Sequence, residues 1–143
     1  MSISGRAVRL KGMTIPFWCL FAAVLLPYVW FSFAAPWRAS QFGKALNLRT
    51  PRLQDPALEG RAARAQGAHC NSLEALAYFA PAVIVAHLAH ADATWAARLA
   101  LLFIACRVAH GLAYIGDRQP LRTASFALGL LSALSLFVLA ACA

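Results

Sequence analysis

The chain has 143 residues, of which 62% are hydrophobic, and it carries a formal net charge of +8 at neutral pH. This composition excludes an ordinary soluble globular protein, in which about half of the residues are apolar, and the length suits a single domain. The positive charge does not indicate a nucleic-acid partner, because the basic residues cluster in segments that flank long apolar runs.

Four apolar runs reach the length of about 20 residues that a membrane-spanning helix needs. They comprise residues 15–35, 73–91, 95–115 and 124–143. A cleaved signal peptide is the alternative for the first run, but that run exceeds the roughly 7–15 apolar residues of a signal. The sequence therefore predicts an all-α membrane protein with a basic N-terminal arm over residues 1–14 and a single four-helix transmembrane bundle over residues 15–143.

Prolines and basic residues predict where these helices begin and end. Pro36 is expected to end the first helix, and residues 38–60 form a long connection that could cover a functional site. The second helix is expected to begin well before Leu73, and Pro120 suits the start of the fourth helix.

The basic residues also predict the topology. Eight of them fall in the first and third connections or at their edges: Arg38, Lys44, Arg49, Arg52, Arg61, Arg64, Arg118 and Arg122. By the positive-inside rule these connections face the cytoplasm and both termini face outward. Part of this charge can also serve lipid headgroups or an anionic ligand. We expect an integral, multi-pass protein of a bacterial inner membrane, with an organelle membrane as the alternative.

Two polar stripes interrupt the apolar runs at the spacing i, i+3, i+7, so that each stripe occupies one face of a helix. They are Asn71, Glu74 and Tyr78 in the second helix, and Arg107, His110 and Tyr114 in the third. Ionisable groups within a membrane span usually face the interior of the bundle and mark a functional site. The stripes therefore predict one shared polar pocket.

The depth of two charges supports this pocket. Glu74 and Arg107 each lie about 15 Å from the basic connections, at 1.5 Å of helix per residue, so an antiparallel pair of helices would bring them to one level. One interpretation is a structural ion pair that joins the two helices. The other is that the pair also orients a ligand, for which the neighbouring polar side chains are suited.

Other polar residues carry weaker signals. Arg122 and Thr123 open the fourth helix, where the arginine is either an interfacial anchor or a fork that binds a carboxylate. His87 and His90 do not predict a metal or haem site, because no further histidine lies at their depth. The four cysteines show no zinc spacing, and we expect no structural disulfide and no metal.

Two stretches, RAQGAHCNSLEALAYF (residues 64–79) and CRVAHGLAYIGDRQPLR (residues 106–122), resemble the MAPEG superfamily, the membrane-associated proteins in eicosanoid and glutathione metabolism. Within it they are similar to the microsomal glutathione transferases and prostaglandin E synthases. The resemblance covers about residues 15–143 and implies a homotrimer that binds glutathione between neighbouring subunits, towards the cytoplasmic side.

The resemblance also implies roles for individual residues. The glutathione-binding group would comprise Arg38 from the adjacent subunit together with Asn71, Glu74, His110 and Tyr114. The catalytic group would comprise Arg107, Arg122 and Thr123. In this reading the chain is a glutathione-dependent transferase, peroxidase or isomerase, whose glutathione thiolate attacks a lipophilic electrophile that arrives from the membrane lipids.

The chain departs from the family pattern at two positions. Gly67 stands where the family often has an arginine, with Arg64 one turn earlier as a candidate to compensate, and Phe126 replaces an aromatic hydroxyl early in the fourth helix. These departures favour the alternative of a non-catalytic scaffold or binding protein. A third hypothesis, a small four-helix drug exporter, is disfavoured because the first apolar run lacks a carboxylate.

Overall fold

The computed structural model describes residues 12–143 and arranges them as a helical bundle, with no strand in this part of the chain. The long helices are α1 (Ile15–Phe42), α2 (Gly60–Leu88), α3 (Ala93–Ile115) and α4 (Gln119–Ala141), and two short 3-10 helices, η1 (Gly43–Ala45) and η2 (Pro51–Ala57), lie between α1 and α2. Each of the four long helices is long and apolar enough to cross a membrane. The prediction of an all-α bundle with four spans is therefore confirmed.

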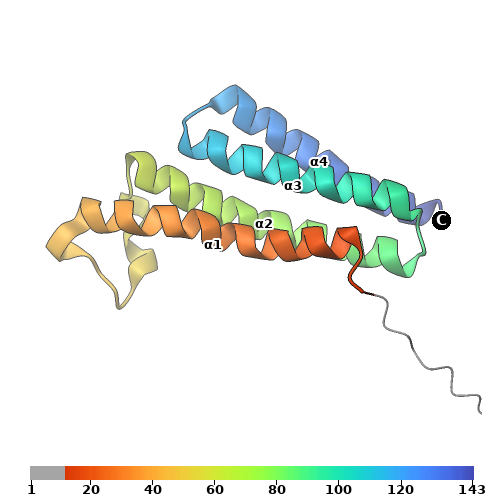
Figure 1. Ribbon diagram of the computed structural model, residues 1–143. Coiled ribbons are helices and arrows are strands. Elements are labelled where there is room, and N and C mark those ends of the chain that lie inside the picture. Colours follow the sequence, from red (N-terminus) through yellow and green to blue (C-terminus); the bar gives the residue numbers. More distant parts are fainter. Residues whose placement is uncertain (1–11) are drawn as a thin grey trace, which may run out of the picture.

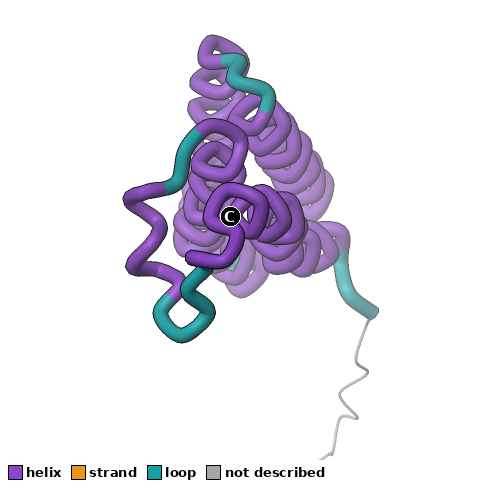
Figure 2. Tube along the Cα trace, turned by 90° about the vertical axis from the view of Figure 1, so that its left-hand side faces the viewer, coloured by secondary structure: helices purple, strands orange, loops and turns teal. Residues whose placement is uncertain are grey.

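The four helices run up and down along one common direction (Figure 1). Helix α1 lies beside α2, α3 lies beside α4, and α2 and α3 each contact both outer helices. The view turned by 90° shows the helices as one bundle, with loops confined to its ends (Figure 2). We call the end formed by residues 43–59 and 116–118 the loop end, and the end formed by residues 12–14, 89–92 and 142–143 the terminal end.

Helix α1 is longer than predicted, because it continues through Pro36 to Phe42 and ends only at Gly43, where φ is +52°. A proline within a helix removes one backbone donor, and contacts made beyond it can offset that loss. Here the last turns of α1 are joined to the following loop. The Gln41 side chain donates to the Ala57 carbonyl (2.8 Å) and accepts from the Glu59 backbone N–H (3.2 Å). The expectation that Pro36 ends the helix was wrong.

The remaining helix boundaries follow their local sequence. Helix α2 begins at Gly60, well before Leu73, and α4 carries Pro120 in its first turn, as predicted. The carboxylate of Asp92 caps α3 by accepting from the backbone N–H of Trp95 (2.8 Å). Of the predicted basic arm, residues 1–11 lie outside the described part of the chain.

The interior of the bundle is built mainly from small side chains. Alanine is the most frequent residue at the buried positions, which lets the helices approach closely. At Gly111 the backbone of α3 lies against Trp30 of α1, so that an added Cβ would come within 2.2 Å of the indole ring. Stacked rings of Phe79 and Phe103, 3.8 Å apart, fill the space between α2 and α3. Large apolar side chains are exposed along all four helices, as lipid contact requires.

Candidate functional site

A buried arginine joins the two polar stripes. Arg107 on α3 is only 1% exposed, and its Nη2 group donates to the backbone carbonyl (3.1 Å) and to the side-chain Oδ1 (3.4 Å) of Asn71 on α2. Its Nε and Nη1 groups have no hydrogen-bond partner within residues 12–143. A guanidinium without a partner at this depth is costly, so these two groups mark a place where a further polar group is needed.

The expected ion pair between Glu74 and Arg107 does not form within the subunit. The two ion pairs among the described residues are Arg38–Asp55 and Arg64–Asp117. Glu74 is exposed, although it lies one turn from Asn71 on the same helix. Arg107 does contact the polar stripe of α2, but its partner there is Asn71.

The other half of the second stripe contacts the start of α4. The carbonyl of Arg122 accepts a hydrogen bond from Nδ1 of His110 (3.0 Å), and Nε2 of His110 has no partner in residues 12–143. The guanidinium of Arg122 lies over the ring of Tyr114, 4.6 Å from its centroid. The rings of His110 and Tyr114 meet edge to face at 5.7 Å. Thr123 follows Arg122 and is exposed. Together with Asn71 and Arg107, these side chains form what we call the polar band, which lies towards the loop end.

Gly67 makes room for Tyr114. A Cβ added at Gly67 would lie 2.7 Å from the phenolic oxygen of Tyr114. A larger side chain at this position would therefore displace the ring that Arg122 covers. Arg64, the candidate to compensate for the missing arginine, is already bound elsewhere. Its Nε donates to the Ile115 carbonyl (3.2 Å) and its Nη1 to the carboxylate of Asp117 (3.5 Å).

Arg38 belongs to a different group of side chains. It pairs with Asp55 of η2 (2.5 Å) and also donates to the Pro51 carbonyl, so it ties the end of α1 to the long connection. Gln66 of α2 donates to the second oxygen of the same carboxylate (3.3 Å). These residues line a cavity of about 420 Å³ between α1, η2 and α2, which includes His69. None of its lining residues belongs to the polar band around Arg122.

Sequence reasoning missed Asp55 and Gln66, and it gave Tyr78 no role of its own. Asp55 could have been noticed as one of only five carboxylates in the chain, placed in a strongly basic connection. The hydroxyl of Tyr78 is buried and has no partner within the described residues. No group of three or more His, Cys, Asp or Glu side chains suited to a metal occurs among residues 12–143.

The MAPEG family model matches residues 15–142, almost the whole sequence. The chain belongs to the MAPEG family. No curated protein matches it in sequence. As a MAPEG protein with four long apolar helices, it is an integral, multi-pass membrane protein. The family in general uses glutathione, and membership indicates a glutathione-related transferase, isomerase or related role in the membrane.

Proposed function

We propose that this MAPEG protein is a glutathione-dependent membrane transferase that activates the thiol of glutathione for attack on a lipophilic electrophile. Peroxidase and isomerase reactions could use the same thiolate. The observation that carries this proposal is the polar band itself. It contains two guanidinium groups, Arg107 and Arg122, with unpaired donors on Arg107 and an unpaired ring nitrogen on His110, all within helices that are otherwise apolar.

The residues of the band match the groups of glutathione. The tripeptide carries two carboxylates, an amine and a thiol, and guanidinium groups bind carboxylates through paired hydrogen bonds. In this proposal Arg107 and Asn71 supply donors. Nε2 of His110 supplies an acceptor, and Glu74 receives the amine. Because Glu74 is exposed and forms no ion pair with its own Arg107, and Arg38 lies in another group of side chains, the site would be completed between subunits of a homotrimer.

In this proposal, the residues at the start of α4 activate the thiol of glutathione. A thiol with a pKa of about 8.5 is mostly protonated at neutral pH, and a guanidinium nearby favours the thiolate. The place of Arg122 over Tyr114 holds its guanidinium in one position, and the Thr123 hydroxyl is free to donate to the sulfur. The thiolate then forms a bond to an electrophilic atom of the lipophile, and the displaced group leaves with the bonding electrons. The protein contributes positioning and charge rather than a covalent residue.

The experiment is to titrate purified protein in detergent with glutathione and to record the ultraviolet difference absorbance of the thiolate. Arg122→Ala should abolish the signal, and Arg107→Ala should weaken glutathione binding measured by calorimetry. Arg118→Ala is the matched control, because Arg118 lies four residues before Arg122 and is exposed, and this variant should behave as the wild type. A folded wild type that neither binds glutathione nor gives a thiolate signal would contradict the proposal.

The second candidate is a non-catalytic membrane scaffold, and the contact between Gly67 and Tyr114 favours it. The family often has an arginine at this position, and here the ring of Tyr114 fills the space while Arg64 is bound to the turn between α3 and α4. A chain with this role would keep its fold and its partners but fail to bind glutathione, so the same calorimetric titration distinguishes the two functions.

A further inference from the structure

The connection between α1 and α2 exposes two leucines more fully than any other large apolar side chain in residues 12–143. Leu48 is 80% exposed and Leu53 is 77% exposed. On the long helices, where lipid contact is expected, the most exposed large apolar residue is Leu88 at 70%. Apolar side chains that gather on a surface mark a contact with a membrane or another protein, so this connection is expected to be covered.

The connection presents these leucines from a folded loop. The side-chain Oδ1 of Asn47 accepts from the backbone N–H groups of Arg49 (2.9 Å) and Thr50 (3.0 Å). The Gln54 side chain accepts from the backbone N–H of Asn47 (2.9 Å) and donates to the Ala45 carbonyl (2.9 Å). Because these hydrogen bonds fix the loop before it meets a partner, docking costs little further ordering.

The charge beside the leucines is positive. Three exposed basic residues precede or follow them in the sequence: Lys44, Arg49 and Arg52. Residues 43–59 contain two carboxylates, Asp55 and Glu59, and that of Asp55 is neutralised by Arg38. The surface formed by residues 44–53, which we call the docking surface, therefore combines apolar side chains with an excess of cations.

The position of the connection matches the headgroup layer of a bilayer. Helix α1 continues for residues 36–42 beyond its apolar run, which adds about 10 Å of helix. Lipid headgroups extend a bilayer from a hydrocarbon core of about 30 Å to about 40–45 Å, so α1 ends at their outer edge. From there the connection projects to one side of the bundle instead of covering its end (Figures 1 and 2).

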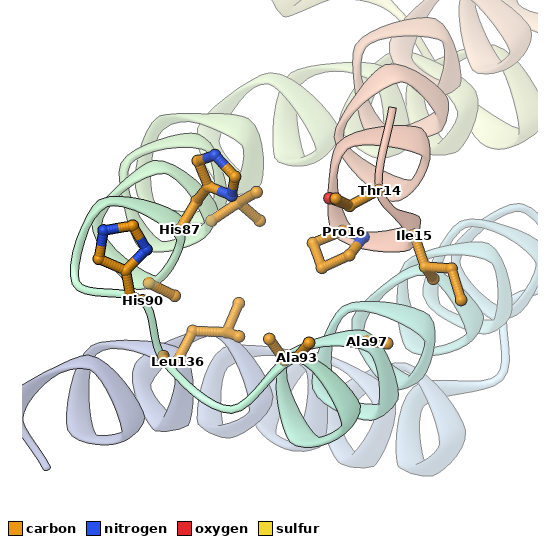
Figure 3. Close-up of a pocket in the computed structure, with 12 residues that line it drawn as sticks. Thr14, Ile15, Pro16, His87, His90, Ala93, Ala97 and Leu136 are labelled. Atoms are coloured by element: carbon orange, nitrogen blue, oxygen red, sulfur yellow. The ribbon is translucent and has the colours of Figure 1, made fainter. Parts of the chain in front are cut away.

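The terminal end has no comparable surface among the described residues. A cavity of about 540 Å³ at that end is lined mainly by apolar side chains, together with His87 and His90, and its lining contains no lysine or arginine (Figure 3). The guanidinium of Arg98, near the start of α3, lies over the ring of Trp95. Exposed leucines and exposed cations therefore occur together at the loop end alone within residues 12–143.

We propose that the docking surface binds the anionic surface of the lipid bilayer. Leu48 and Leu53 rest in the headgroup layer, and Lys44, Arg49 and Arg52 contact the phosphates of acidic phospholipids. Proteins bind such surfaces by combining apolar insertion with clusters of basic residues. A neighbouring subunit suits this surface less well, because the cores of protein interfaces are depleted in charged residues, lysine among them. The contact requires no glutathione and is independent of the proposed transferase reaction.

The test measures whether the connection enters the headgroup layer. A nitroxide is attached to Leu48→Cys in the full, otherwise cysteine-free chain, which is placed in nanodiscs of phosphatidylcholine or of an equal mixture with phosphatidylglycerol. Electron paramagnetic resonance reports the exposure of the label to a water-soluble nickel chelate. This exposure should fall several-fold in the mixed nanodiscs, and high salt should reverse part of the fall by screening the charges. A label at Asp117→Cys, exposed in the turn between α3 and α4, is the control and should remain accessible in both.

The role of the cations is tested with Arg49→Gln/Arg52→Gln, which should abolish the response of the Leu48→Cys label to phosphatidylglycerol. The matched control is Arg61→Gln/Arg118→Gln, which removes the same charge from exposed positions at the same end of the bundle and should keep the response. A label that stays accessible in both kinds of nanodisc would overturn the proposal. Protection in both kinds would also overturn it, by assigning the leucines to a contact between subunits, as would a response that survives Arg49→Gln/Arg52→Gln or appears equally at Asp117→Cys.

Discussion

Replacing Arg107 distinguishes a structural role of the polar stripes from a role in ligand binding. Replacing a buried charge by an apolar side chain of similar size is often neutral or stabilising, whereas a structural ion pair loses stability when one partner is removed. We predict that Arg107→Met changes the free energy of unfolding by less than about 1 kcal/mol, or increases it, while glutathione binding is weakened. Thermal unfolding in detergent and calorimetry measure the two effects. A variant that unfolds readily would assign Arg107 a structural role.

A second prediction concerns the substitution of Gly67. Its missing Cβ leaves the space that the Tyr114 hydroxyl occupies, and overpacking of this kind typically costs about 1–3 kcal/mol. Gly67→Ala should therefore lower the unfolding temperature and weaken glutathione binding, because Tyr114 is displaced from Arg122. Adding Tyr114→Ala to Gly67→Ala should restore part of the lost stability. If Gly67→Ala alone is as stable as the wild type, the ring moves aside without cost.

Contacts between individual side chains were the features that the sequence predicted least completely. The spacing of Asn71 and Arg107 predicted which helix faces meet, since a stripe follows from the helical repeat alone. It did not predict that Asn71 rather than Glu74 would bind Arg107, because that choice depends on the side-chain conformation and on the rotation between neighbouring positions. The contact of Gly67 with Tyr114 joins residues 47 positions apart in the chain, and no local pattern encodes it.

For the helices and their connections, the extension of α1 beyond Pro36 depends on the loop that follows it. Hydropathy and proline predicted an earlier end, since neither reports that Arg38 would find Asp55 some 17 residues later. The starts of α2 and α4 were predicted well, because local signals such as Pro120 act on the helix in which they stand. Local rules thus succeed where the cause is local and fail where a distant residue stabilises an extra turn.

The pairing of Arg38 with Asp55 leads to a prediction for the long connection. Asp55→Ala should loosen residues 43–59, because it removes the carboxylate that both Arg38 and Gln66 contact. Limited digestion with trypsin, which can cut at Arg49 and Arg52, should become faster. The matched control is Asp117→Ala, which removes an exposed pair at the same end of the bundle and should change stability by less than about 1 kcal/mol. Equal digestion of the wild type and Asp55→Ala would show that the connection is held by other contacts.

In the whole molecule, the four spans could be predicted from hydropathy because lipid replaces water around the helices. Large apolar side chains are accordingly exposed on every one of them. The pairing of α1 with α2 and of α3 with α4 was not predicted from the sequence, since apolar side chains occupy both the exposed surface and the interior. Small residues at contacts such as Gly111 with Trp30 select the neighbours, and their significance emerges only from the three-dimensional arrangement.

The orientation in the membrane is tested with a cysteine-free variant of the chain. Leu53→Cys, at a 77% exposed position of the loop end, should react with a membrane-impermeant maleimide only in inverted vesicles. Ala143→Cys, at the terminal end, should react only in intact spheroplasts. This pattern follows from the concentration of arginine and lysine at the loop end, and the reverse pattern would place that end outside the cytoplasm.

The hydrogen bond between Arg107 and Asn71 has a consequence for how the protein is made. An arginine near the centre of a span costs about 2.5–3.5 kcal/mol on insertion scales, which weighs against the entry of α3 alone. Its partner stands on α2, which leaves the ribosome first. The backbone carbonyl and side-chain amide of Asn71, which accept hydrogen bonds from Arg107, are therefore already within the bilayer when α3 emerges. The two helices can then enter the membrane as a hairpin. The order of the helices along the chain thus sets an order of biogenesis, in which Arg107 arrives after the group that receives it.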